Sequence, residues 1–409
     1  MQKIPPTGTT PLAKREARLA WSLLSPTIIS VALVVVLPLL AIFWISVKPV
    51  SLADLRPPTP IVREDVRGDG QDLSIRYRIR NSSQEQAISN VTLNDIIPNS
   101  VSISGKLPEI CRLSENVLLC DFGTLDGGQG DRLLIPISVS DKESAENALK
   151  GTEPTVTGTS SNVLTDSTFT FDNFTRIFDG DEFWGVFGVT LFYTIFGTIG
   201  ALVVGLFAAL LLNKEFRGQG VLRGLYLFPY VAPVIAVAFS WLILFDPFSG
   251  SANELLIQMG AIESSINFFG ERPQALIMVT LFEIWRYFPL SFLFILARMQ
   301  SIDTDMYEAA DMDGATPFQK FWYLSIPQLL GILSVLFLLR FIWTFNKFDD
   351  IFLLTGGNAG TRTLTVNVYE QAFAVSNIGA GAAVAVVIFC CLLAFSFFFF
   401  RFMSKEEGL

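Results

Sequence analysis

Six long apolar runs constrain the fold of this chain more than any other feature. A membrane-spanning helix needs about 20 mostly apolar residues. Six stretches approach or exceed that length: 21–47, 183–212, 221–245, 274–297, 328–345 and 378–400. The first is too long for a signal peptide and lacks a small-residue cleavage site, so we expect it to be retained. With 51% hydrophobic residues overall, the sequence predicts a mainly α membrane protein with six transmembrane helices.

Composition excludes several classes of function. The chain has no histidine, which rules out a Ser-His-Asp hydrolase and a histidine-based zinc site. It has no GxxxxGK[ST] motif to hold ATP phosphates. Its net charge of −9 is unfavourable for binding nucleic acid. These absences exclude catalytic, zinc and ATP sites of those kinds.

Basic residues are distributed unevenly between the two sets of short loops. One set carries Lys14, Arg15, Arg18, Lys214, Arg217, Arg223, Arg298, Lys320, Arg401 and Lys405, and the other only Arg272, Lys347 and Arg362. Cytoplasmic loops carry the excess of Lys and Arg. The pattern predicts that both termini are cytoplasmic and that residues 49–182, after the first helix, are extracytoplasmic.

The insertion after the first helix has a different pattern. LSIRYRIRN (73–81) and RLLIPISVS (132–140) alternate apolar and polar residues with period two, as half-buried strands do. NVTLNDIIP (90–98) and the Gly-Gly turn at 127–128 lie between them. These features predict a small all-β sandwich inserted between helices 1 and 2.

The four cysteines fall into two pairs. Cys390 and Cys391 lie in the last apolar run and are expected to be packing residues. Cys111 and Cys120 lie in the β region, on neighbouring strands or on one hairpin. A disulfide between them is compatible with an extracytoplasmic location, and the sequence leaves that bridge open.

A polar segment at residues 307–327, YEAADMDGATPFQKFWYLSIP, separates two apolar runs. Its first residues favour a short helix, and Gly314 would end that helix or allow a tight turn. Pro317 would start a second helix, with Thr316 near its cap. Pro327 is expected to mark the return into the membrane. The alternative is an ordinary loop with solvated carboxylates.

This segment resembles the cytoplasmic coupling loop of ABC-importer permeases, through its Glu-Ala-Ala, the glycine six residues after the glutamate and the closing proline. That family usually ends the loop with Ile-x-Leu-Pro, where this chain has Leu-Ser-Ile-Pro at 324–327. Residues 171–401 resemble the carbohydrate branch of the family (maltose-, glycerol-phosphate- and trehalose-like permeases), through FDNFTRIF, LYLFPYVAPVIAVAFSWLILFDPFSG and LLTGGNAGTRTLTVNVYEQAF. The resemblance implies that the residues coupling to an ATPase are Tyr307, Glu308, Ala309, Ala310, Asp313, Gly314, Ala315 and Pro327.

Residues 75–140 resemble an Ig-like repeat of bacterial surface proteins. The predicted domains are then a cytoplasmic N-terminus with the first helix (1–48), an extracytoplasmic β-sandwich with linker (49–182), a five-helix permease core (183–401) and a cytoplasmic tail (402–409).

Polar and aromatic side chains in or beside the spans are candidates for a solute path, because polar groups in a bilayer usually face a cavity or a partner. The candidates are Glu283, Trp285, Arg286, Tyr287, Phe345, Asn346 and Asp349. Several alternatives remain open. Glu283 and Arg286 would instead neutralise each other on one helix. Arg340 would meet a partner at a subunit interface. Asp349 and Asp350 would lie solvated at the membrane surface.

The resemblance implies one permease subunit of an ATP-driven importer in a bacterial plasma membrane. This subunit would be non-catalytic and would bind no metal or cofactor of its own. The cargo would be a sugar or sugar-like compatible solute, such as a disaccharide or a glucosylglycerol-type osmolyte. The partners would be a second homologous permease, two ATPase subunits that bind ATP and Mg²⁺, and an extracytoplasmic solute-binding protein. The β domain would be a docking or shielding element.

Other functions stay open at this point. The chain could be a permease for another small solute, a membrane-anchored adhesion protein or receptor, or an ion channel or secondary transporter. An adhesion protein needs only one or two spans and leaves residues 307–327 unexplained. The apolar pattern shows no inverted repeat of the secondary-transporter kind.

Overall fold

The computed structural model describes residues 11–68, 73–84, 86–139, 142–180 and 182–403. The start of the predicted N-terminal segment (1–10) and most of the predicted tail (404–409) lie outside the described residues. The chain divides into two compact units. The membrane unit comprises Met1–Val47, Phe171–Val375 and Gly379–Leu409, and the β unit comprises Lys48–Thr170 and Ser376–Ile378.

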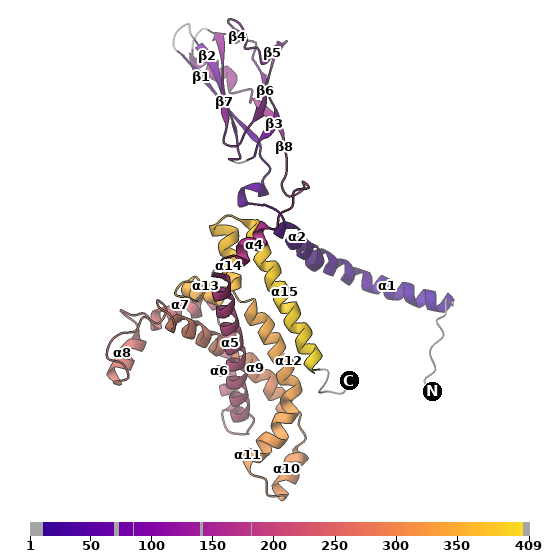
Figure 1. Cartoon of the computed structure of the whole chain (residues 1–409), viewed down its shortest axis with the longest axis vertical. Coiled ribbons are helices and arrows are strands. Elements are labelled where there is room, and N and C mark those ends of the chain that lie inside the picture. The colour runs from indigo at the N-terminus through magenta and orange to yellow at the C-terminus, as the bar shows by residue number, and fades with distance from the viewer. Residues whose placement is uncertain (1–10, 69–72, 85, 140–141, 181, 404–409) are drawn as a thin grey trace. The chain divides into compact units, whose positions relative to one another are not determined.

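Two four-stranded antiparallel sheets make up the β unit (Figure 1). In one sheet the order is β1 (Pro60–Arg67), β2 (Leu73–Asn81), β7 (Gly130–Ser138) and β4 (Ser102–Ile103). In the other it is β5 (Cys111–Ser114), β6 (Val117–Leu125), β3 (Ile88–Ile96) and β8 (Thr155–Ser160). The unit also contains the 3₁₀ turn η2 (Leu52–Leu55) and the helix α3 (Lys142–Leu149).

The sequence alternation in the strands reflects burial. On β2, Leu73, Ile75, Tyr77 and Ile79 are buried and share one hydrophobic core with side chains of the opposite sheet, such as Leu93. The predicted strand at 73–81 is confirmed. The strand predicted at 132–140 begins two residues earlier, at Gly130, and the segment 90–98 falls largely within β3. Period-two patterning locates a strand well and its ends less well.

The membrane unit consists of helices, most of which are visible in Figure 1. They are α1 (Pro11–Val31), α2 (Leu37–Ser46), α4 (Asp172–Phe178), α5 (Glu182–Leu212), α6 (Gln219–Val231), α7 (Val234–Leu244), α8 (Ser251–Gln258), α9 (Gln274–Gln300), α10 (Thr304–Met312), α11 (Pro317–Lys320), α12 (Ile326–Phe345), α13 (Asp349–Thr355), α14 (Leu364–Tyr369) and α15 (Ile378–Met403). Three π-helical turns extend them: η1 (Ala32–Val36), η3 (Phe321–Ser325) and η4 (Glu370–Ala374).

Among the described residues, five helices are long and apolar enough to cross a membrane: Leu12–Ser46, Glu182–Leu212, Gln274–Gln300, Pro317–Phe345 and Ile378–Phe402. The run predicted as one helix at 221–245 is instead the pair α6 and α7, bent by 92°. Proline has no N–H and forces the residue before it out of the helical region. Pro233 therefore breaks the run, and Ala232 is extended, with ψ of 143°. By length and composition, the described residues therefore hold five candidate spans, or six if this bent pair counts as one.

Pro327 neither begins nor ends a helix. α11, η3 and α12 form one helical stretch from Pro317 to Phe345, and Pro327 lies inside it. The π-helical turn already shifts the bonding pattern here, because the N–H of Ile326 bonds to the carbonyl of Phe321, five residues back. Pro327 follows directly on this widened turn, so its ring is accommodated without ending the helix.

Close packing of α5 on α9 forms the centre of the membrane unit, and α12 packs on α5 as well. A Cβ placed on Gly205 of α5 would lie 2.6 Å from the Cβ of Ser291 on α9. Small residues at a helix crossing allow backbones to approach closely in membranes. This crossing fixes the positions of the polar side chains that α9 and α12 carry.

Candidate functional site

The polar segment at 307–327, called here the coupling segment, folds as two capped helices. Asp303 caps α10, accepting a hydrogen bond from the Asp305 backbone N–H at 3.1 Å. At its other end Gly314 has φ of +75°, and the N–H of Ala315 bonds to the carbonyl of Ala310 at 2.9 Å. This is a Schellman-type ending, for which glycine is the usual residue.

The second helix of the coupling segment starts as the sequence indicates. Pro317 occupies the first helical position of α11, and Thr316 caps it through a capping box with Gln319. The predicted order of a short helix, a glycine turn and a proline-led helix is confirmed.

Two side-chain contacts attach α10 to the helix that continues into the membrane. The hydroxyl of Tyr307 lies 2.9 Å from that of Ser325, in η3. The ammonium of Lys320 lies 2.6 Å from the carboxylate of Asp311. Because Ser325 and Lys320 belong to the stretch that forms the span ending at Phe345, a displacement of α10 would be passed directly to that span. Neither attachment was predicted from the sequence.

Much of the remaining surface of the coupling segment is exposed in the described part of the chain. Glu308, Ala309, Asp313 and Gly314 are exposed, whereas Ala310 and Ala315 are half-buried. A Cβ on Gly314 would meet no described atom within 4 Å. Large side chains are exposed beside them, with Met312 at 89%, Phe318 at 71% and Tyr323 at 77%. Figure 1 shows α10 and α11 together beyond the ends of α9 and α12. Such a protruding, partly apolar surface suits a protein partner.

A second feature is a buried charge network between the helices. The Glu283 carboxylate on α9 accepts hydrogen bonds from Arg340 at 2.7 Å and Thr344 at 2.9 Å, both on α12. Its other oxygen accepts from the hydroxyl of Tyr193 on α5 at 3.0 Å. The side chains of Glu283 and Arg340 are 1% and 2% exposed. This arrangement corrects two expectations: Glu283 does not pair with Arg286, and Arg340 has its partner within this chain.

Arg286 instead stabilises the broken helix. Its guanidinium donates to the carbonyls of Pro229 and Ala232, each at 3.2 Å. In an unbroken helix the Pro229 carbonyl would accept from residue 233, but Pro233 has no N–H to give. The arginine satisfies the carbonyl that this proline leaves unpaired. The buried guanidinium of Arg286 on α9 therefore stabilises the bend between α6 and α7.

The acidic pair after α12 is divided between two environments. Asp350 is buried, with Arg286 at 4.0 Å and Lys347 at 3.6 Å. Asp349 lies 3.1 Å from Lys347, and its side chain is 48% exposed. The expectation that both carboxylates are solvated is wrong for Asp350, because α13 turns its first residues back against α9. Lys347 also donates to the Tyr287 hydroxyl.

The structure brings only some of the predicted solute-path residues together. Glu283, Arg286 and Tyr287 belong to the charge network, and Asp349 joins it through Lys347. Trp285 packs against Trp241 and Phe282, with ring centroids 5.5 and 6.2 Å away. Phe345 is buried in a separate hydrophobic cluster, whereas Asn346 is exposed and bonds to its own helix. Two network residues, Tyr193 and Thr344, were not predicted, although polar residues interrupting apolar runs were a visible signal.

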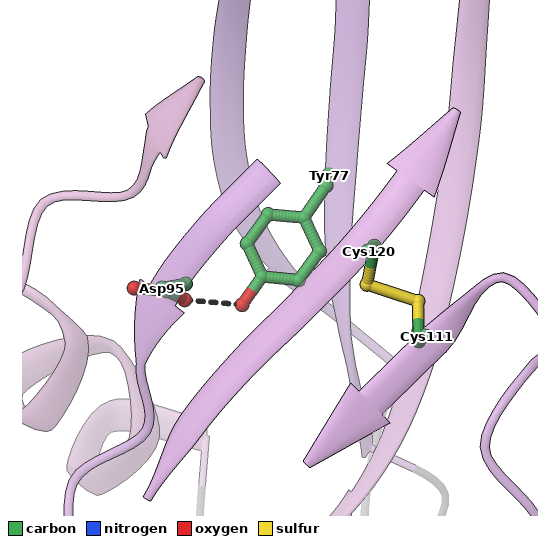
Figure 2. Close-up of a disulfide and its surroundings, with 4 residues drawn as sticks. All are labelled: Tyr77, Asp95, Cys111 and Cys120. Carbon is green, nitrogen blue, oxygen red and sulfur yellow. Dashed lines mark hydrogen bonds between the residues drawn. A yellow bond between two sulfur atoms is a disulfide. The ribbon is translucent and has the colours of Figure 1, made fainter. Parts of the chain in front are cut away.

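The cysteines of the β unit are bonded to each other. Cys111 and Cys120 are directly opposite in the β5–β6 hairpin and form a disulfide, seen in Figure 2. Both are buried. Cys390 and Cys391 are free thiols on α15. Within the described ranges, no group of three or more His, Cys, Asp or Glu residues could hold a metal ion.

Comparisons with known proteins each cover about half of this chain. Residues 201–405 match the family described as "Binding-protein-dependent transport system inner membrane component". The inner membrane ABC transporter permease protein YcjO of Escherichia coli (strain K12) is 36% identical over 222 residues, which are 54% of this chain and 75% of YcjO. The trehalose/maltose transport system permease protein MalF of Thermococcus litoralis is 32% identical over 214 residues, 52% of this chain and 72% of MalF.

The sn-glycerol-3-phosphate transport system permease protein UgpA of Yersinia pestis is 31% identical over 238 residues, 57% of this chain and 79% of UgpA. Among solved structures, a chain of the bacterial alginate ABC transporter in complex with an alginate pentasaccharide-bound periplasmic protein aligns with a TM-score of 0.54. The alignment covers 58% of this chain and 83% of that chain at 19% identity, so it shows a common fold.

Proposed function

Because this chain belongs to the family of binding-protein-dependent transport system inner membrane components, in its carbohydrate branch, we propose that it forms one half of the path of an ATP-driven importer. The cargo is a sugar or a sugar-like compatible solute, such as a disaccharide or a glucosylglycerol-type osmolyte. A second homologous permease forms the other half. ATP and Mg²⁺ are bound by two separate ATPase subunits, and an extracytoplasmic binding protein delivers the solute.

The observation that carries this proposal is the coupling segment. It is exposed, it is capped at both helices, and Tyr307 and Lys320 attach it to the helix that ends at Phe345. A rigid element of this kind transmits the closure of soluble ATPase subunits to the membrane helices. Glu308 and Gly314 are exposed and would contact the ATPase, while the two attachments carry the movement to α12.

The rest of the membrane unit is suited to moving as a block. α5, α9 and α12 meet at the Glu283–Arg340–Tyr193 contacts, where every charge has a partner inside the bundle. A displacement of α12 therefore carries α9 and α5 with it, which is the rigid-body rocking that alternating access requires. No chemistry is performed on the solute.

The substrates for which two relatives are named support the solute class. MalF of Thermococcus litoralis serves trehalose and maltose, and UgpA serves sn-glycerol-3-phosphate. The β unit, with its disulfide, is suited to an oxidising extracytoplasmic location, where it would dock or shield the binding protein.

The coupling role is tested in the complex reconstituted with its permease and ATPase partners, by measuring ATPase stimulation by loaded binding protein. Glu308→Lys and Gly314→Trp should each reduce the stimulation at least about tenfold, since they place a repulsive charge or a bulky ring at the contact surface. Gly260→Trp is the matched control, because Gly260 also has positive φ (+68°) and open space around it. Glu254→Lys, on exposed α8, controls for the charge change. Full stimulation in both test variants would refute the coupling role.

The solute class is tested with binding protein loaded from a panel of sugars, polyols and glycosylated osmolytes. We expect stimulation by at least one of them. Stimulation by an amino acid or an ion alone would overturn the carbohydrate assignment while leaving the coupling role intact.

A further inference from the structure

A small cavity in the membrane unit shares no lining residue with the charge network around Glu283. It has a volume of about 140 Å³ and is enclosed by α4, the first turns of α5, α14 with η4, and the start of α15. None of the residues that line it belongs to the candidate solute path or to the coupling segment.

The polar part of the lining is three amides, a guanidinium and a carboxylate. Asn367 and Gln371 are four residues apart, so they lie on one face of the α14–η4 stretch. Both are half-buried, and no side-chain hydrogen bond within the described part of the chain involves either amide. The third amide, Asn173, already donates to a backbone carbonyl of α2 at 2.9 Å. Arg176 and Glu182 complete the polar lining. Their charges cancel, so the cavity as a whole is neutral.

The walls are braced by neighbouring contacts. Arg362 pairs with Glu370 and, at 2.9 Å, with Glu182, and so holds η4 to the start of α5. The backbone N–H of Leu364 donates to Thr190 of α5 at 3.0 Å. These contacts keep the cavity in place without using the amides of α14 and η4. The apolar part of the lining includes Ile177, Val186 and Val384.

The lining selects the kind of ligand. A side-chain amide offers both donors and an acceptor, and leaving it unpaired when a ligand excludes water is costly. A purely apolar ligand would impose that cost on Asn367 and Gln371. An ion would find no net charge of the opposite sign. A neutral polyhydroxylated molecule satisfies the amides with hydroxyl groups and covers the apolar wall with its C–H face.

The volume limits the size of that molecule. One water needs only about 10–15 Å³ of such space, whereas pockets for drug-sized ligands measure about 300–1,000 Å³. At about 140 Å³, the cavity is large enough for a small polyol or one sugar ring. We propose that it is a binding site for one ring of a neutral sugar or for a small polyol, separate from the central path. The choice of this solute class rests on the proposed function; the location and neutrality of the site do not.

The test measures binding of radiolabelled D-glucose to the purified full-length chain by equilibrium dialysis, in a detergent without a sugar headgroup. A ligand with so few atoms should bind with a dissociation constant on the order of 1 mM. Asn367→Leu/Gln371→Leu removes the hydrogen-bonding groups at nearly constant volume and should weaken binding at least about tenfold. Gln258→Leu, an exposed amide on α8, is the matched control and should bind as the unmodified chain does.

Three further arms keep the result unambiguous. If the double variant does not elute as a folded protein, Gln371→Glu replaces it, since it removes one NH₂ donor and keeps the shape. Asn346→Leu, in the candidate solute path, tests the other location: binding that is lost in this variant and kept in the cavity variants would overturn the proposal. Unlabelled glycerol should compete, and arginine and acetate should not. Undiminished binding by the cavity variants, or no saturable binding by the unmodified chain, would overturn the proposal. The two proposals can fail separately. If the chain binds glucose as expected and the reconstituted complex with Glu308→Lys keeps full ATPase stimulation, the coupling role is rejected and this binding site is retained.

Discussion

The guanidinium of Arg340 on α12 lies 2.7 Å from the carboxylate of Glu283 on α9, although the two residues are 57 positions apart in the sequence. Both side chains are almost completely buried. In a membrane protein the pair removes two isolated charges from an apolar environment at once, and it joins two spans that the chain connects only through the coupling segment.

Removing one member of this pair should cost more than removing both charges. Arg340→Met leaves the Glu283 carboxylate buried without its counter-charge, which we expect to lower stability by about 3–5 kcal/mol. Glu283→Gln/Arg340→Met should recover most of that loss, because the new side-chain amide oxygen still accepts from Tyr193 or Thr344. Thermal unfolding in detergent, followed by tryptophan fluorescence, checks both variants. Equal unfolding temperatures for the single and the double variant would show that the unpaired Glu283 carboxylate does not destabilise the protein.

The crossing of α5 and α9 should not tolerate one extra methyl group. In Gly205→Ala the new Cβ would lie 2.6 Å from Ser291 and 2.8 Å from the Phe292 nitrogen, both on α9. The helices must separate, and we expect a loss of about 1–3 kcal/mol. Gly185→Ala, also on α5 but with no described atom within 4 Å, should be neutral or slightly stabilising. Thermal unfolding of the two variants side by side measures the difference.

The Tyr307–Ser325 contact should matter for coupling and little for folding. Tyr307→Phe removes a hydrogen bond worth about 0.5–1.5 kcal/mol, so ATPase stimulation should fall between about twofold and tenfold. Ser325→Ala should have the same effect, and the double variant should add nothing further. Tyr323→Phe is the control, since that side chain is 77% exposed. Equal stimulation in Tyr307→Phe and Tyr323→Phe would show that the contact transmits nothing.

The β unit should lose stability as the pH rises through neutrality. Burial, and then the neighbouring Asp95, raise the pKa of Glu64 from 4.5 to about 7. Burial also raises the pKa of Asp95, which accepts a hydrogen bond from Tyr77, as Figure 2 shows. A carboxyl group whose pKa is raised by folding makes its full contribution to the stability of the folded state at pH values below the pKa it has in the unfolded chain, near 4.5. That contribution falls as the pH rises and is lost once the pH exceeds the folded-state pKa of about 7.

Hydrogen–deuterium exchange of peptides from β2 and β3, corrected for intrinsic rates, should therefore show weaker protection at pH 8 than at pH 5. Glu64→Gln should remove most of this difference, because an amide does not ionise. Glu109→Gln, in a loop of the same unit, should leave it in place. If the protection still depends on pH in Glu64→Gln, the pH dependence comes from other groups.

The disulfide should stabilise the β unit selectively. Cys111 and Cys120 are nine residues apart, so the loop that the bond closes is short and its contribution is about 2–3 kcal/mol in the chain-entropy view. Cys111→Ser/Cys120→Ser should increase exchange in β5 and β6 and leave α5 and α9 unchanged. Cys390→Ser/Cys391→Ser, which alters only the two free thiols, is the control. Unchanged protection in the β5–β6 hairpin would show that pairing of the strands stabilises the hairpin without the disulfide.

Local patterns in the sequence were sufficient for much of the fold. Runs of about 20 apolar residues identified the membrane helices, and period-two alternation identified β2, because both patterns record which side chains avoid water. The two helices of the coupling segment were also predictable, since Gly314 and Pro317 act on their own backbone and need no distant partner. The ends of elements and the 92° bend at Pro233 were not: a proline predicts a break, but the packing around it sets the angle.

The sequence by itself therefore determined the class of protein, the membrane helices and the capped form of the coupling segment. Only the tertiary structure decided the partners of two buried charges and one half-buried hydroxyl: Arg340 with Glu283, Arg286 with the carbonyl left unpaired by Pro233, and Tyr307 with Ser325. The physical reason is that hydrophobicity and backbone preference act within a few residues. A charge or a hydroxyl inside the bundle is paired by whichever side chain the helix crossings bring within about 3 Å, and no local pattern encodes that choice.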